Sequence, residues 1–401
     1  MARFFVYGMF RSGTTLIARQ LDAHPNITCA SDPFRPFFNA FRDSVANDLE
    51  IECGPYDPLG DYFADDEQLR LFEAIQEISL SHPFDRDSGQ LLQRIRQHGE
   101  PFSPYVADAV ARRHVMGDTF AKILDTLLEE VNAQYGSDND VWTGTKEVWT
   151  TEFLPLLKQE YPDSKHIIVI RDPRAVCASK YAQDSVYPWL FLIRQWRKLS
   201  LLAYKYAIIE EMPDVHIVRY EDLIRDPEDT SRNLCEFLSI QFDTTLITPE
   251  CFTDGHGKPW VQNTSYDLDA NKFFYTESIS RWKNTLPRAV TEYIEALTIS
   301  EMRLFGYKPL HAEEAQISEN QFLSPPRLDI EDFAAWIRPY YDNRSNISLV
   351  NEMATEHARH RLLATPESTL DDVDRRVKEA YFLDTQLLDA CRSQLGVATE
   401  K

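Results

Sequence analysis

The chain has 401 residues, of which 43% are hydrophobic and 26% are charged, and this globular composition excludes wholesale disorder and collagen-like repeats. Its 42 Lys and Arg stand against 64 Asp and Glu, so the net charge is −22 and we expect no nucleic-acid partner and no anionic membrane surface. The length predicts two domains, or one large domain with additions. No apolar run reaches about 18 residues, so no transmembrane helix is predicted.

The chain start and the cysteines indicate the cellular compartment. Arg11 interrupts the first apolar run, so the start lacks the pattern of a secretory signal. The six cysteines include no Cys-x-x-Cys pair, which is typical of proteins in a reducing compartment. We therefore expect a cytoplasmic protein.

Short β-branched runs and longer helical patterns alternate along the chain. The short runs predict buried strands at 4–8, 166–170 and 215–220. Apolar residues at helical spacing predict helices at 14–23, 66–80, 118–134, 189–211, 287–305, 346–362 and 369–395. Strands separated by helices indicate parallel pairing through right-handed crossovers. The expected fold class is α/β, a P-loop-like three-layer α/β/α domain around a central parallel sheet.

Two regions depart from this alternation. The stretch of about 40–140 is rich in Asp, Pro and polar residues and is predicted to be a helical insertion. A proline-marked linker at 324–326 lies in the last part of the chain. We expect one domain at 1–310 and a helical C-terminal extension at 311–401, whose helices could pair two copies of the chain in a homo-oligomer.

Residues 8–15, Gly-Met-Phe-Arg-Ser-Gly-Thr-Thr, lie between the first predicted strand and the first predicted helix. A glycine-containing loop in this place turns backbone N–H groups toward an anion, and the helix N-terminus adds positive partial charge. The spacing matches the P-loop pattern GxxxxGK[ST], except that Thr14 replaces the lysine. ATP-type phosphoryl transfer needs that lysine, so Arg11 and the hydroxyl groups favour a less charged transferring group. The alternative is a turn that only starts a helix.

Positive charge is concentrated in two segments of this acidic chain. Residues 1–40 hold four Arg against two Asp, and residues 165–200 hold seven Lys or Arg against two Asp. This distribution favours a phosphate-bearing ligand at both segments, although ordinary fluctuation is an alternative. Arg174, in the second segment, is either a further phosphate ligand or a residue that only faces solvent.

Four blocks resemble, in order, those of the PAPS-dependent sulfotransferases, especially the branch with the tyrosylprotein and carbohydrate sulfotransferases. They are the phosphosulfate loop 10–16 with 21–25, the 3′-phosphate block 168–179, the strand 218–223 and the late segment 280–283. The resemblance covers about 4–40 and 140–310. It implies an enzyme that transfers a sulfuryl group from PAPS (3′-phosphoadenosine 5′-phosphosulfate) to a hydroxyl or amine and releases PAP.

The resemblance also implies which residues bind the cofactor. The matching positions are Arg11, Ser12, Gly13, Thr14, Thr15, Arg171, Ser179, Tyr220, Arg281, Trp282 and Lys283. Arg171 and Ser179 suit the 3′-phosphate, because a guanidinium fork and a hydroxyl both donate to phosphate oxygens. Arg171 could instead form a strand-end salt bridge with Asp172 or Glu221. Trp282 is either an adenine platform or a core residue.

Sulfuryl transfer requires a base for the acceptor and cations near the bridging oxygen. The resemblance places Asp32 at the base position and Lys146 at a lysine that stabilises the leaving phosphate, with Arg11 and Ser265 as further catalytic groups. Aspartate is shorter than the family's glutamate, and His24 is the rival base. No metal is expected, because the ten His show neither HxxxH nor HExxH spacing.

Two other functional classes stay open at this point. A P-loop nucleotide or small-molecule kinase would show Mg²⁺-dependent ATP turnover, and a non-catalytic binding protein would keep the fold without the chemistry. The retention of Arg11, Lys146, Arg171 and Ser179 disfavours the non-catalytic protein. The acidic surface disfavours polyanionic acceptors, so we expect a neutral sugar, a phenol or other small molecule, a hydroxylated lipid or a natural-product intermediate.

Overall fold

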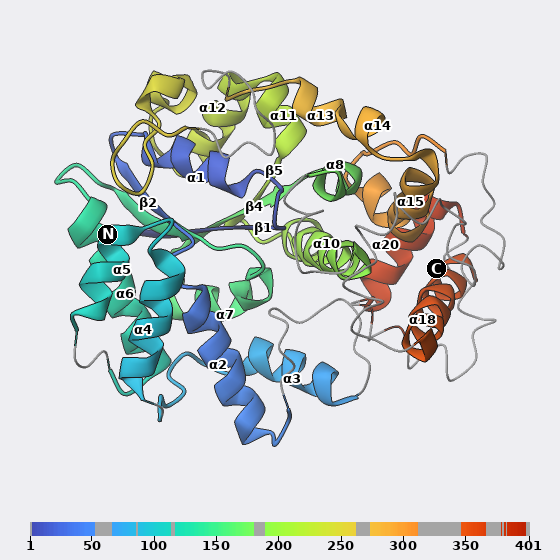
Figure 1. The fold of residues 1–401 in the computed structure, drawn as a ribbon, viewed down its shortest axis with the longest axis horizontal. Helices are drawn as coiled ribbons and strands as arrows, with labels where there is room; N and C mark the ends of the chain where they lie inside the picture. Colours follow the sequence, from blue (N-terminus) through green and yellow to red (C-terminus); the bar gives the residue numbers. More distant parts are fainter. Residues whose placement is uncertain are drawn as a thin grey trace. The chain divides into compact units, whose positions relative to one another are not determined.

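The computed structural model describes residues 2–52, 66–85, 87–113, 117–179, 189–261, 273–311, 346–365, 378, 381 and 383–397. These residues form two compact units (Figure 1). The first comprises the described residues of Met1–Leu59, Asp65–Ile170 and Glu211–Tyr275. The second comprises those of Arg171–Glu210 and Thr276–Lys401.

A five-stranded parallel sheet in the order β2-β3-β1-β4-β5 forms the centre of the first unit. Its strands are β1 (Ala2–Gly8), β2 (Ile27–Ser31), β3 (Trp142–Lys146), β4 (Lys165–Ile170) and β5 (Val215–Arg219). The predicted strands at 4–8, 166–170 and 215–220 are confirmed, whereas β2 and β3 were not predicted. Because all strands run in one direction, their carboxyl ends meet at one edge of the sheet.

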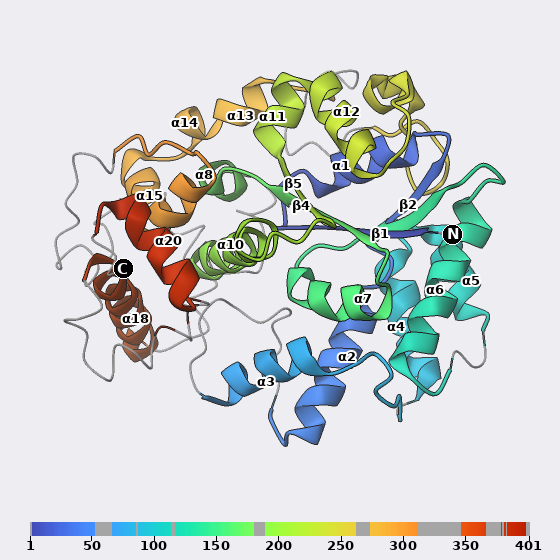
Figure 2. The same cartoon turned by 180° about the vertical axis from the view of Figure 1, so that it is seen from behind.

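Helices cover both faces of this sheet (Figures 1 and 2). One face carries α1 (Thr14–Asp22), α11 (Tyr220–Arg225) and α12 (Pro227–Phe237). The other carries α2 (Arg35–Asp48), α6 (Phe120–Tyr135) and α7 (Leu154–Glu160). Helices α3 (Asp66–Glu77), α4 (Ser88–Gly99) and α5 (Pro104–Ala111) pack against α2 and α6. The three-layer α/β/α fold and the helical character of the insertion are therefore confirmed.

The second unit is helical. Its helices are α8 (Pro173–Cys177), α10 (Trp189–Tyr204), α13 (Glu277–Ser280), α14 (Trp282–Thr285), α15 (Arg288–Leu304), α18 (Asn346–Ala364) and α20 (Thr385–Leu395). α10 continues into a π-helical stretch at Lys205–Ile209. The unit contains α10 and α15 together with the C-terminal helices, so the boundary at 310/311 stays a prediction. Within the described ranges, no helix is both long and apolar enough to cross a bilayer.

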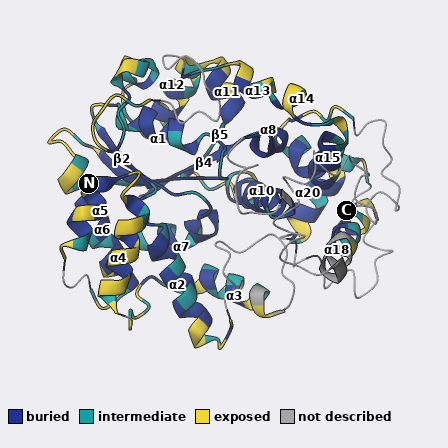
Figure 3. Ribbon diagram, in the orientation of Figure 1, coloured by how far each residue is buried: buried dark blue, intermediate teal, exposed yellow. Residues whose placement is uncertain are grey.

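The two strands that sequence reasoning missed are short and carry small or polar side chains. All five residues of β3, Trp-Thr-Gly-Thr-Lys, are buried, and so are the five of β2 (Figure 3). A Cβ on Gly144 would lie 2.3 Å from the carbonyl oxygen of Phe4, so β1 and β3 approach closely only because this residue is glycine. Packing against the neighbouring strand, rather than hydropathy, therefore determines where β3 lies.

β2 is one of the two edge strands of the sheet, and two side chains form hydrogen bonds with its outer backbone groups. The N–H of Cys29 donates to Asp22 Oδ1 at 2.8 Å, and the N–H of Ser31 donates to Ser103 Oγ at 3.1 Å. The Ser103 hydroxyl in turn donates to the carbonyl of Ser31 at 2.8 Å. These bonds satisfy backbone groups that a further strand would otherwise pair.

The close approach at Gly144 gives a stability prediction. Gly144→Ala places a methyl group against backbone that cannot move without shifting β1, so the unfolding free energy should fall by about 1–3 kcal/mol. Thermal unfolding followed by circular dichroism measures this loss. The matched control is Gly89→Ala at the start of α4, where the nearest atom is the Asp87 carboxylate at 3.1 Å, and its melting temperature should not fall. Equal melting temperatures for both variants would contradict the packing argument.

Candidate functional site

The loop between β1 and α1 leaves no room for side chains at its two glycines. A Cβ on Gly8 would lie 2.7 Å from both Thr14 Cγ2 and the carbonyl oxygen of Val169. A Cβ on Gly13 would lie 2.3 Å from the ring of Tyr220, and Gly13 has a left-handed φ of 95°. The predicted site residue Tyr220, at the start of α11, therefore packs on the loop and holds its turn in place.

The same loop contains a buried hydroxyl group that has no hydrogen-bond partner within the described residues. The N-cap of α1 is Gly13, so no side chain caps the first-turn N–H groups. The N–H of Ser12 closes a turn with the carbonyl of Met9 at 3.0 Å, whereas the fully buried Ser12 Oγ has no hydrogen-bond partner within the described residues. A buried hydroxyl without a partner is uncommon in folded proteins. Together with the helix N-terminus, it fits an anion bound in this loop.

The structure brings two predicted catalytic residues, Asp32 and Lys146, into direct contact. Lys146 Nζ forms an ion pair with Asp32 Oδ2, and the two side chains are only 1% and 13% exposed. The N–H of Asp32 donates to the carbonyl of Lys146 at 2.6 Å, and the N–H of Val148 donates to Asp32 Oδ1 at 3.4 Å. The carboxylate is thus fixed at the carboxyl ends of β2 and β3.

Sequence reasoning missed a second carboxyl group at this place. Glu147 is buried, its Oε1 accepts from the N–H of Phe34, and its Oε2 has no hydrogen-bond partner within the described residues. Burial, and after it the negative charge of Asp32, holds the pKa of Glu147 well above its usual range. Segments 32–34 and 146–148 therefore bind each other reciprocally. The sequence signal that could have identified Glu147 is its position directly after the predicted catalytic Lys146.

Three loops at the carboxyl edge of the sheet each contain a non-glycine residue with a left-handed backbone. These residues are Arg11 after β1 (φ 69°), Asp32 after β2 (φ 45°) and Trp149 after β3 (φ 63°). Such conformations cost about 1–3 kcal/mol each and cluster at functional sites. The surroundings fix them: the Trp149 N–H donates to the carbonyl of Gly8 at 3.1 Å, and its indole N–H lies 3.2 Å from Met9 Sδ.

The rival base, His24, lies at the other end of α1 from Thr14 and is already engaged. Its Nε2 hydrogen-bonds the carbonyl of Gln241 at 2.9 Å, and its Nδ1 accepts from the N–H of Asn26 at 3.1 Å. The ring is buried and joins the helix end to its neighbours. This geometry favours Asp32 over His24. The predicted helper Ser265 lies outside the described residues.

A cavity of about 460 Å³ lies along the edge of β2. The predicted insertion contributes Ser103, Tyr105, Gln134 and Tyr135 to its walls, and His24 also lines it. Asp32 and Lys146 do not line it, so the part of the insertion described here forms a hollow beside the edge strand rather than around the ion pair.

In the second unit, Arg171 directly follows β4 in the chain and is held by its neighbours. Its Nη2 donates to the carbonyl of Ser278 at 3.0 Å, and its own carbonyl accepts from the indole N–H of Trp196 at 2.8 Å. Asp172, an expected alternative partner for Arg171, pairs with Arg174 at 2.7 Å. Ser179 is buried two residues after α8.

The alternative in which Arg174 only faces solvent is wrong. Its guanidinium is 4% exposed and forms ion pairs with Asp172 and Glu295, the latter at 2.5 Å. It also stacks 3.9 Å above the centroid of the Trp282 ring. Trp282 is itself buried in a hydrophobic cluster formed by α8, α10, α14 and α15, a placement that agrees with its core alternative. The neighbouring Lys283 is exposed.

The prediction that the positive charge of segment 165–200 favours a phosphate-bearing ligand also needs correction. Its arginines include three that are buried and ion-paired: Arg174 with Glu295, and Arg194 and Arg197 with Glu356. Acidic side chains neutralise these charges inside the unit. They therefore do not make the segment a surface that attracts phosphate.

A profile described as "Sulfotransferase family" matches residues 3–244. This chain belongs to the sulfotransferase family. The match contains the loop at 8–15, Asp32, Lys146, Arg171 and Tyr220, and the family recognition from the four sequence blocks is confirmed.

Several known proteins are similar to this chain. The sulfotransferase is 23% identical to carbohydrate sulfotransferase 5 of Mus musculus over 356 residues, covering 80% of this chain and 85% of that protein. It is 23% identical to protein-tyrosine sulfotransferase 2 of Gallus gallus over 318 residues, covering 77% and 70%. The sulfotransferase domain from the Synechococcus PCC 7002 olefin synthase aligns over 77% of this chain and 95% of that one, with 16% identity and a TM-score of 0.45.

The buried Glu147 predicts an unusual pH dependence of stability. Its folded-state pKa is raised above the ordinary 4.5, so the folded protein binds this proton more tightly than the unfolded chain. The unfolding free energy should therefore fall as the pH rises from 4.5 toward the raised pKa. Glu147→Gln cannot titrate, so its melting temperature relative to the wild type should increase from pH 4.5 to neutral pH. Exposed Glu129→Gln should show a constant offset, and a constant offset for Glu147→Gln would reject the argument.

Proposed function

We propose that this sulfotransferase transfers a sulfuryl group from PAPS to a hydroxyl or amine of an acceptor, giving PAP and a sulfated product without a metal. The carrying observation is the buried Ser12 hydroxyl, which has no hydrogen-bond partner in the part of the chain that the structure describes and lies beside the N-terminus of α1, where no side chain caps the helix. In a sulfotransferase family member, a donor set of this kind fits the 5′-phosphosulfate of the cofactor.

The proposed binding roles belong to the loop after β1, to segment 171–179 and to two late basic residues. The loop donors Arg11, Ser12, Gly13, Thr14 and Thr15 take the 5′-phosphosulfate, and Tyr220 holds the loop glycine. Arg171 and Ser179 take the 3′-phosphate, with Arg281 and Lys283 as further cations near the nucleotide. We do not extend this role to Trp282, because its ring is buried beneath Arg174.

Asp32 and Lys146 are the proposed chemical groups. When bound, PAPS supplies the sulfuryl group on a phosphate that departs as PAP. Asp32 accepts the proton from the acceptor hydroxyl as the new oxygen–sulfur bond forms and the sulfur–oxygen bond to phosphate breaks. Lys146 stabilises the charge that develops on the departing phosphate oxygen. The ion pair between the two side chains places both groups at the carboxyl ends of β2 and β3.

The acceptor is proposed as a small hydroxylated molecule. The relatives include proteins named for carbohydrate and for protein-tyrosine acceptors, so sugar and phenol hydroxyls are the first classes to test. A hydroxylated lipid or a natural-product intermediate offers the same reacting group.

PAP binding tests the function directly. Isothermal titration calorimetry in EDTA should show PAP binding, and addition of Mg²⁺ should leave its affinity unchanged. Arg171→Ala should weaken it by about 2–5 kcal/mol, because it removes a charge-assisted phosphate contact. The exposed Arg288→Ala on α15 serves as the matched control and should bind PAP normally. Absence of PAP binding by the wild type would contradict the proposal. Binding of ATP with Mg²⁺ in place of PAP would favour the kinase alternative.

Asp32→Asn tests the proposed base. The amide keeps the shape but cannot accept the proton, so kcat should fall by roughly 10²–10⁴-fold while PAP affinity changes little. The ion pair with buried Lys146 is lost in either case, so the melting temperature should fall. A merely structural carboxylate predicts in addition that PAP affinity falls together with the rate. Asp43→Asn, which alters a carboxylate paired with Arg42 on α2, controls for the loss of an ion pair elsewhere. Normal turnover by Asp32→Asn would remove Asp32 from the mechanism.

A further inference from the structure

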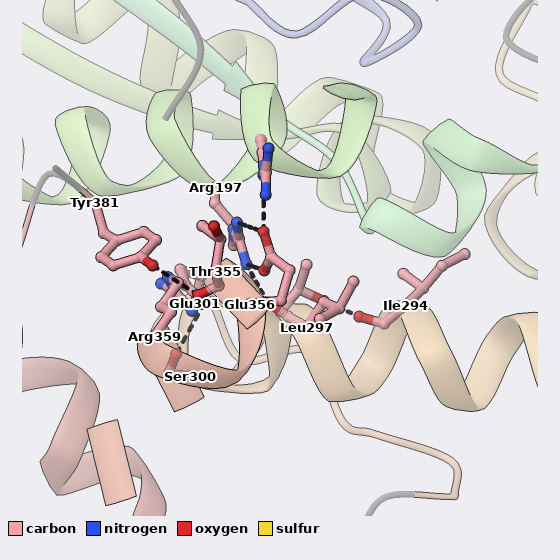
Figure 4. A network of polar contacts seen from close by, with 11 residues as sticks. Arg197, Ile294, Leu297, Ser300, Glu301, Thr355, Glu356, Arg359 and Tyr381 are labelled. Atoms are coloured by element: carbon pink, nitrogen blue, oxygen red, sulfur yellow. Dashed lines mark hydrogen bonds and ion pairs between the residues drawn. The ribbon is translucent and has the colours of Figure 1, made fainter. Parts of the chain in front are cut away.

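Residue Glu356 lies on α18, in the part of the chain that follows the family match at residues 3–244. Its fully buried carboxylate forms ion pairs with two arginines of α10, a helix that lies inside the match. Oε2 is 2.6 Å from Arg197 Nη1, and Oε1 is 2.7 Å from Arg194 Nε (Figure 4). The C-terminal extension therefore supplies the counter-charge for buried arginines of the family domain.

The charges in this contact depend on one another. Burial acts to raise the pKa of Glu356, but Arg197 and Arg194 outweigh it and lower the pKa to about 2. Arg197 also donates to the carbonyl of Leu297 on α15 at 3.1 Å, so one guanidinium joins α10, α15 and α18. Replacing the carboxylate by a neutral group would leave two positive charges facing each other in a buried space, which is strongly unfavourable.

α10 also holds the segment proposed to bind the 3′-phosphate. Trp196 lies between the two arginines in sequence, and its indole N–H donates to the carbonyl of Arg171 at 2.8 Å. The three side chains belong to one turn of a rigid helix, so a displacement of the arginines displaces the indole donor as well. A displacement of α10 would therefore disturb the hydrogen bond to the backbone carbonyl of Arg171.

A second contact links the extension to the same segment. The carboxylate of Glu295 on α15 pairs with Arg174, which follows Arg171 by three residues. Both oxygens of Glu295 also accept backbone N–H groups where the extension begins, from Leu310 and from His311, each at 2.8 Å. Segment 171–179 is thus held by contacts with α10 and with α15. Residues at or beyond 310 contact both helices, since Glu356 pairs with α10 and Leu310 and His311 donate to Glu295 on α15.

We propose that Glu356 is a positioning residue for segment 171–179, which it holds through Arg194, Arg197 and Trp196 of α10. The part of this inference that concerns the 3′-phosphate rests on the proposed function. Residues beyond 310 then complete the nucleotide-binding part of the protein instead of forming an independent appendage.

Hydrogen–deuterium exchange of the full chain tests the positioning without any ligand. In Glu356→Gln, the amides of 171–179 should exchange about tenfold faster or more, because their support by α10 is weakened. The melting temperature should fall by roughly 5–10 °C. The control is Arg392→Gln, since buried Arg392 donates to the carbonyls of Leu362 and Thr365, and it should lower the melting temperature without faster exchange at 171–179.

PAP titration of the same variants tests the functional consequence. Glu356→Gln should weaken PAP binding about tenfold. Trp196→Phe, which loses the indole donor and part of the ring volume but leaves the ion pairs intact, should weaken it by a similar factor with a smaller fall in melting temperature. Arg392→Gln should bind PAP like the wild type. If wild-type protein binds no PAP, the proposed function fails, whereas the exchange data still decide the positioning role.

Two results would overturn the inference. One is unchanged exchange at 171–179 in a folded Glu356→Gln variant. The other is equal exchange and PAP affinity in Trp196→Phe and wild type, which also decides the question if Glu356→Gln does not fold.

Discussion

A charge that is taken out of water needs an opposite charge beside it, because the cost of burying an unpaired ion exceeds the net stability of most domains. This sulfotransferase family member contains several buried ions that are paired with a partner from a distant part of the chain. In the first unit Lys146 pairs with Asp32. In the second, Arg174 pairs with Glu295, and Arg197 with Glu356. Hydrophobic side chains of similar volume would often give equal stability, so these pairs act mainly by specifying which element lies next to which.

At the carboxyl edge of the sheet, the need to pair a buried charge determines how the ends of β2 and β3 are arranged. The lysine has almost no access to solvent, so its charge requires the Asp32 carboxylate, and the backbone bond from Asp32 to the Lys146 carbonyl brings the two strand ends into register. Glu147 is the neighbouring group that receives no cation of its own, and its pKa is raised accordingly. One carboxyl thus lies beside a cation, whereas burial raises the pKa of the next. Such divergent environments for adjacent acids are typical of sites that move protons.

Local pattern was sufficient for the elements in which apolar residues recur at strand or helix spacing, and for the loop with its two glycines. The strands β1, β4 and β5, the helices α1 and α15, and the loop at 8–15 were predicted because hydropathy and glycine spacing determine them. β2 and β3 escaped prediction because their burial comes from neighbouring strands, as Gly144 against Phe4 illustrates. The contact between Asp32 and Lys146 was implied only through the family resemblance, since 114 positions separate the two residues and no local pattern encodes their pairing.

The arginines of segment 165–200 show why charge patterning alone misleads. Counted along the sequence, they form a basic segment that suits a phosphate, yet Glu295 and Glu356 lie more than a hundred residues away and neutralise three of them. A sequence count cannot distinguish a cation that awaits a ligand from one that already has an internal partner. The guanidinium of Arg171 donates to the carbonyl of Ser278, and its backbone carbonyl accepts from Trp196. The buried pairs therefore form the scaffold, and the arginine that they hold in place is the one for which a phosphate contact is proposed.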